Sequence, residues 1–105
     1  MNLKMKNEIQ NLVINAANEL NNLLDNKLLT DRGSDCELYG QSGMLDSIAL
    51  VTLIVKIEEK IEAKFDTPII LANEKAMSQK RSPFLTIGTL STYIESLIAS
   101  EVRYA

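Results

Sequence analysis

A chain of 105 residues is long enough to bury a core and too short for two domains, so we expect residues 1–105 to form a single domain. Hydrophobic residues make up 46 % of the chain and aromatic residues only 5 %, which predicts an aliphatic core, and the small number of prolines and glycines favours helices over a turn-rich β architecture. A formal net charge of −3 argues against nucleic acid as a partner, because phosphate binding needs a basic surface.

The negative charge is concentrated in the middle of the chain. Residues 35–66 carry seven acidic and three basic side chains, so we look for a partner surface there. Cys36 is the only cysteine, which rules out an intramolecular disulfide, and in a chain without histidine it is a poor candidate nucleophile. No apolar run reaches the ~18 residues of a membrane span, and the N-terminus lacks the pattern of a signal peptide. We therefore expect a cytoplasmic protein with no membrane span.

The N-terminal third predicts one long helix followed by a loop. Hydrophobic residues recur at three- and four-residue spacing over residues 3–28 and predict an amphipathic helix that ends between residues 27 and 29. Glycine, serine and aspartate over residues 30–46 are typical of a loop, and we expect Leu38 and Tyr39 to attach it to the core.

Two further long helices and one short helix are predicted after this loop. The second long helix runs from Ser47 to about Lys64, with Asp46 as its N-cap. Residues 73–80 predict a short helix, and the last helix begins after Thr86 and ends near residue 101. The predicted fold class is therefore all-α, a four-helix bundle of three long helices and one short one.

The helix after Asp46 carries two apolar faces. At 100° per residue, one face forms an obvious core stripe, which contains Leu50, Leu53, Ile54, Ile57 and Ile61. A second, narrower stripe contains Ile48, Val51 and Val55. Either this helix is central and buried on both sides, or the second stripe is an exposed strip that suits transient docking.

Ser47 is the first residue of that helix. The unpaired N–H groups and the helix dipole favour an anion at this end by ~0.3–1 kcal/mol at an exposed site. A serine at a helix start is also simply a common part of the cap, so the residue by itself leaves both interpretations open.

The stretch Gly43–Val51 resembles the modification site of acyl carrier proteins, whose Gly-x-Asp-Ser-Leu signature opens their second helix. In this chain one extra residue separates the glycine from Asp46-Ser47, and Ile48 replaces the leucine. An apolar run that ends in paired glutamates, over residues 50–61, is similar to the second helix of that family. The pattern Thr-Ile-x-x-Leu-x-x-Tyr-Ile, over residues 86–94, is similar to its last helix. The resemblance covers residues 35–98.

The resemblance implies a bundle of acyl-carrier type with a 4′-phosphopantetheine arm attached covalently to Ser47 by a phosphopantetheinyl transferase. Asp46 would assist that enzyme or position the arm. The strip Ile48, Val51 and Val55 would contact partner enzymes, and Glu58 and Glu59 would attract their Lys and Arg side chains. The other partners would be a loading ligase for an acyl or aminoacyl group and downstream transferases, and we expect the chain to be a monomer.

Three departures from the family, one of them an extended N-terminal helix, indicate a specialised role. Ala49 and Thr52 are uncharged, although an acid is usual at Thr52 in members that serve fatty acid synthesis, and residues 67–85 form a long basic segment. These differences favour a dedicated pathway in secondary metabolism or surface-polysaccharide modification. The alternatives are an aminoacyl or peptidyl carrier, or a helical interaction module that is never modified. We do not expect an enzyme, because no nucleophile–base pair or metal-ligand cluster is recognisable in the sequence.

Overall fold

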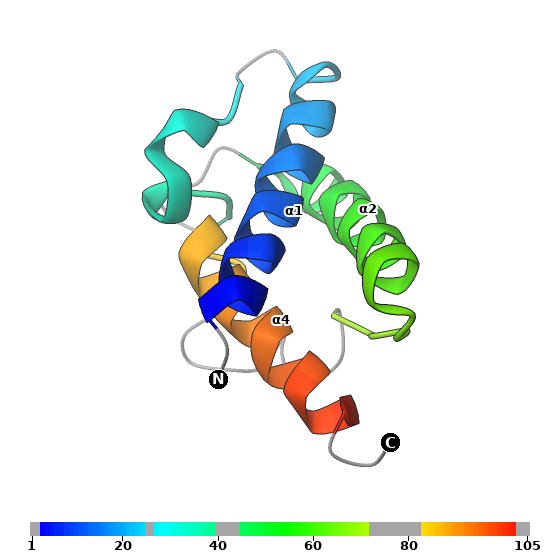
Figure 1. The fold of residues 1–105 in the computed structure, drawn as a ribbon. Helices are drawn as coiled ribbons and strands as arrows, with labels where there is room; N and C mark the ends of the chain where they lie inside the picture. The colour runs from blue at the N-terminus through cyan, green and yellow to red at the C-terminus, as the bar shows by residue number, and fades with distance from the viewer. Residues whose placement is uncertain (1–2, 25–26, 40–44, 72–82, 103–105) are drawn as a thin grey trace.

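The computed structural model describes residues 3–24, 27–39, 45–71 and 83–102, and the described part is mostly helical (Figure 1). It contains three long α-helices and one short 3-10 helix, which are α1 (Leu3–Asn21), η1 (Thr30–Asp35), α2 (Ser47–Phe65) and α4 (Ile87–Val102). This confirms the predicted all-α class and the three long helices. The short helix predicted over residues 73–80 lies outside the described residues.

Helix α1 ends earlier than its hydrophobic pattern predicts, at Asn21 rather than between residues 27 and 29. The side-chain oxygen of Asn21 accepts the backbone N–H of Leu28 at 2.7 Å, and its amide nitrogen donates to the Leu28 carbonyl at 3.1 Å. The ammonium of Lys27 donates to the carbonyl oxygens of Asn21 and Leu24, which the end of a helix leaves unpaired. These side-chain contacts stabilise a turn where the periodicity would have continued the helix, and they leave Leu23 exposed.

The segment after α1 is fastened to the start of α4 by backbone hydrogen bonds. Leu38 donates its N–H to the Leu85 carbonyl at 2.7 Å, and Ile87 donates to the Cys36 carbonyl at 3.0 Å. The side chain of Leu38 is fully buried and that of Tyr39 is partly buried. The predicted attachment of this loop to the core is therefore confirmed.

Both ends of α2 are set by aspartates. Asp46 has an extended backbone and its carboxylate accepts the N–H of Ala49 at 2.8 Å, which confirms the predicted N-cap. At the other end Asp66 adopts the left-handed conformation with φ of 52° and donates its N–H to the Glu62 carbonyl. The helix thus ends three residues before Pro68, with the left-handed Asp66 as its C-cap.

Helix α4 begins as predicted after Thr86, whose side-chain oxygen accepts the N–H of Thr89 at 3.1 Å. Helix α1 packs against both α4 and α2, and Figure 1 shows it between the other two. The core between these helices is almost entirely aliphatic, as the composition predicts, with Phe84 as its one fully buried aromatic side chain among the described residues. None of the described helices has the length and hydropathy needed to span a membrane.

Candidate functional site on helix α2

The first turn of α2 presents Ser47 to solvent. Ser47 is exposed, and Asp46 before it is exposed as well. The first backbone bond within the helix runs from the N–H of Leu50 to the Asp46 carbonyl at 2.9 Å, so the N–H groups of Ser47 and Ile48 precede the helical ladder. An anionic group attached to the Ser47 hydroxyl would lie next to these N–H groups and the positive end of the helix dipole.

The second apolar stripe of α2 is exposed, so the interpretation that this helix is buried on both sides is wrong. Ile48 is 80 % exposed, Val51 is 55 % exposed and Val55 is 45 % exposed. The five residues of the other stripe are all buried, as predicted. Because the two stripes lie on different sides of the helix, α2 contributes to the core and still displays a strip of three aliphatic side chains that begins beside Ser47. We refer to Ile48, Val51 and Val55 as the apolar strip.

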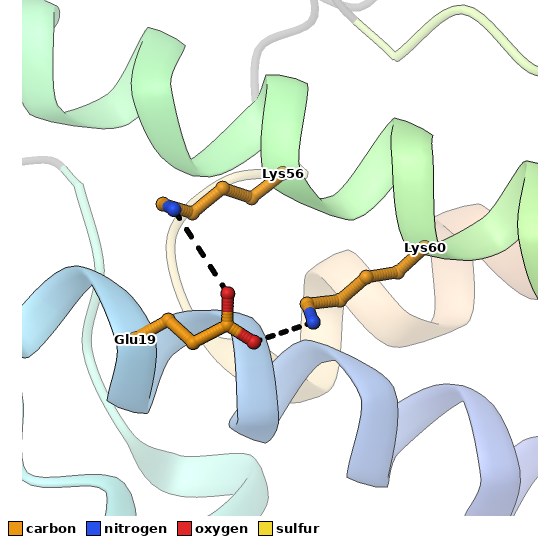
Figure 2. A network of polar contacts seen from close by, with 3 residues as sticks. All are labelled: Glu19, Lys56 and Lys60. Carbon is orange, nitrogen blue, oxygen red and sulfur yellow. Dashed lines mark hydrogen bonds and ion pairs between the residues drawn. The ribbon is translucent and has the colours of Figure 1, made fainter.

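Two lysines of α2 are drawn toward α1 by a single carboxylate. Glu19 of α1 accepts a hydrogen bond from the ammonium of Lys60, and the ammonium of Lys56 lies 3.9 Å from its other oxygen (Figure 2). The pKa of Glu19 is lowered, mainly by the hydrogen bond from Lys60 and further by the positive charges of Lys60 and Lys56. The positive charge of α2 is therefore partly neutralised on the side that faces α1, away from the apolar strip.

Acidic side chains continue the exposed side of α2 beyond the apolar strip. Glu59 is exposed, as its predicted docking role requires. Glu62 is also exposed, and it lies seven residues after Val55, which places it on nearly the same face of the helix. Helical spacing predicts Glu62 at the far end of the second stripe, and the structure leaves it exposed there. The surface of α2 that begins at Ser47 therefore runs from aliphatic to acidic.

Glu58 differs from its neighbour Glu59 because it already has a partner within the chain. Its carboxylate accepts the backbone N–H of Leu71 at 2.8 Å in a partly buried environment. The structure thus brings Ser47, Asp46, the apolar strip and Glu59 to one exposed side of α2, and it turns Glu58 toward the segment that follows the helix.

Cys36 is outside this site and fully buried. Burial raises the pKa of its thiol above the ordinary value, which disfavours the nucleophilic thiolate. The expectation that Cys36 is not a catalytic nucleophile agrees with this environment, in which the residue acts as a small core side chain.

An open groove of about 730 Å³ lies on another side of the molecule, between α1, η1 and α4. Hydroxyl-bearing side chains dominate its lining, among them Ser34, Thr89, Thr92 and Ser96. No residue of α2 lines this groove. The exposed site residues of α2, Ser47, the apolar strip and Glu59, therefore lie outside this groove.

Comparison of the chain with models of protein families, with curated proteins and with solved structures gives no match.

Proposed function

We propose that this chain is a carrier protein of acyl-carrier type, with Ser47 as the attachment site of a 4′-phosphopantetheine arm. The observation that carries the proposal is an exposed serine at the first position of a capped helix, directly beside an exposed apolar strip. A transferase needs the serine hydroxyl to be accessible, and it needs a surface next to that hydroxyl on which to dock. The N-terminal end of α2 offers both on one helix.

The residues present fit such an arm. The Ser47 hydroxyl supplies the oxygen for the phosphodiester, and the N–H groups that precede the helical ladder stabilise its negative charge. When attached, the arm would supply a thiol that holds an acyl group as a thioester. Asp46 keeps the first turn of α2 ordered through its bond to Ala49, so the attachment point stays fixed on the bundle.

The apolar strip and the acids beyond it support recognition by enzymes that carry a basic surface around an apolar contact. Charge complementarity of this kind mainly raises the association rate and selects partners, and it weakens as salt rises. A carrier has to leave each enzyme after delivery, so a small strip with an exposed acidic margin suits the role better than a large hydrophobic interface. The function would be to present a bound acyl group to successive enzymes in a dedicated biosynthetic pathway.

The experiment is a modification assay. The chain is incubated with coenzyme A and a promiscuous phosphopantetheinyl transferase, and its intact mass is measured. We expect one added arm on the parent chain and on Ser34→Ala, which removes another exposed serine, and none on Ser47→Ala. If an active transferase adds nothing to the parent chain, the carrier proposal is wrong, and Ser47 serves only as the start of a helix in an interaction module.

A further inference from the structure

The segment that follows α2 is held against that helix by a side chain. The carboxylate of Glu58 accepts the N–H of Leu71, a residue 13 positions further along the chain, at 2.8 Å. Ile69 and Leu71 are buried, whereas Ile70 between them is 71 % exposed. The hydrogen bond therefore fixes a stretch of chain whose two buried residues anchor it and whose middle residue points outward.

The position of Glu58 on α2 places this stretch next to the apolar strip. Glu58 follows Val55 by three residues and Val51 by seven, so the three side chains lie on neighbouring positions of one side of the helix. Lys56 and Lys60 lie on a different side, where they meet Glu19 of α1. Residues 69–71 thus border the exposed strip on the side away from α1.

A small apolar hollow adjoins Ile70. It has a volume of about 240 Å³ and is lined by Pro68, Ile69, Ile70 and Leu97. All four lining residues are hydrophobic, so the hollow suits an aliphatic or aromatic side chain better than a polar one. Beyond the apolar strip, Glu59 and Glu62 are exposed and provide negative charge on the same helix.

We propose that Glu58 is a positioning residue that holds residues 69–71 against α2, so that Ile70 and its hollow extend the docking surface beyond the apolar strip. The occupant is an apolar side chain on a basic surface of a partner enzyme, because an apolar hollow and exposed acids occur together. The charges that attract the partner are those of Glu59 and Glu62, and the Glu58 carboxylate acts through the segment that it holds. This inference rests on the proposed carrier function, with the transferase as the partner tested.

The test compares Glu58→Gln with Glu58→Ala. Glutamine keeps an oxygen that accepts the Leu71 N–H and removes the negative charge, whereas alanine removes both. Amide hydrogen exchange at Leu71 and the transferase KM and kcat for each unmodified variant are measured. We expect Glu58→Ala to speed exchange at Leu71 and to raise KM, each by about tenfold, with kcat retained. We expect Glu58→Gln to stay near the parent in all three.

The contribution of Ile70 is measured with a matched pair of exposed residues. Ile70→Asp and Leu23→Asp replace aliphatic side chains that are 71 % and 72 % exposed by the same charged one. We expect Ile70→Asp to raise the transferase KM several-fold and Leu23→Asp, just after the end of α1, to leave it unchanged.

Each contrary result has a definite meaning. If Glu58→Gln raises KM as much as Glu58→Ala, the Glu58 charge itself meets the partner and the positioning role is wrong. If Ile70→Asp leaves KM unchanged, the docking surface ends at α2 and the extension is wrong. If the transferase does not modify the parent chain at all, the carrier function fails and the extended docking surface fails with it, whereas exchange at Leu71 still decides whether Glu58 holds the segment.

Discussion

The first turn of α4 lies so close to η1 that a Cβ atom on Gly88 would be 2.9 Å from the carbonyl oxygen of Ser34. A backbone oxygen cannot rotate away as the end of a long side chain can, so Gly88→Ala forces the two elements apart. Overpacking costs about 1–3 kcal/mol, and the better helix propensity of alanine returns at most about 1 kcal/mol. We expect a net loss of about 1–2 kcal/mol in the free energy of unfolding, measured by urea denaturation.

Thr92→Ala is the control for Gly88→Ala. It places alanine at an exposed position of the same helix and should leave stability within about 0.5 kcal/mol of the parent. A Gly88→Ala variant as stable as Thr92→Ala would mean that η1 is not packed against α4 in solution as described.

Val51 belongs to the proposed docking surface of α2, whereas Leu53 belongs to the core. Val51 is exposed and Leu53, two residues later, is fully buried. Val51→Asp should leave stability within about 0.5 kcal/mol of the parent and lower the transferase kcat/KM by about tenfold, equivalent to about 1.4 kcal/mol of transition-state stabilisation. Leu53→Ala should lower the free energy of unfolding by about 2–5 kcal/mol, because it leaves a cavity. A Val51→Asp variant that is loaded as fast as the parent would contradict the role of the apolar strip.

Replacing either of two buried polar side chains on α4 should stabilise the fold. Ser91 Oγ and Glu95 Oε2 are buried and have no hydrogen-bond partner within the described part of the chain. Burying a hydroxyl or amide without a hydrogen bond costs about 1–3 kcal/mol in proteins. We expect Ser91→Ala and Glu95→Met each to raise the free energy of unfolding by about 1 kcal/mol in thermal or urea denaturation. A decrease in either variant would mean that the replaced polar group is bonded in solution.

The contacts of Glu19 with Lys60 and Lys56 make stability depend on pH in acid. Its carboxyl pKa is lowered below the ordinary value of 4.5 in the folded chain, so the folded state binds fewer protons than the unfolded state in that range. The stabilising contribution is present above the ordinary pKa and is lost as the pH falls through the lowered one. We expect the difference in unfolding free energy between the parent and Glu19→Gln to shrink over this acid range in urea denaturation. A difference that stays constant with pH would exclude the charge as its cause.

The helices that could be predicted correctly are those whose ends depend on local chemistry. Asp46 and Thr86 cap the helices that follow them, and each makes its bond within three residues along the chain. The end of α1 was predicted six to eight residues too late because it depends on hydrogen bonds between the Asn21 side chain and the backbone of Leu28. Periodicity continued through residues 22–24 and contained no sign of that contact. The hydrogen bond from Leu71 to Glu58 could not be predicted for the same reason, since it joins α2 to a residue 13 positions further along, in a segment without regular structure.

The helical class, the capped start of α2 at Ser47 and the two apolar stripes of that helix could be predicted from the sequence, because they follow from turn-by-turn spacing and short-range hydrogen bonds. The sequence left open whether the second stripe is buried as well, and the folded structure leaves it exposed. The two stripes are similar in chemistry, and the long-range packing of the chain, in which α1 contacts α2, buries one stripe and leaves the other exposed to solvent. The adjacent glutamates also have different environments, since Glu58 accepts a hydrogen bond from the following segment and Glu59 is exposed. This difference could not be predicted from local sequence, because the partner of Glu58 lies 13 residues away and reaches it only in the folded chain.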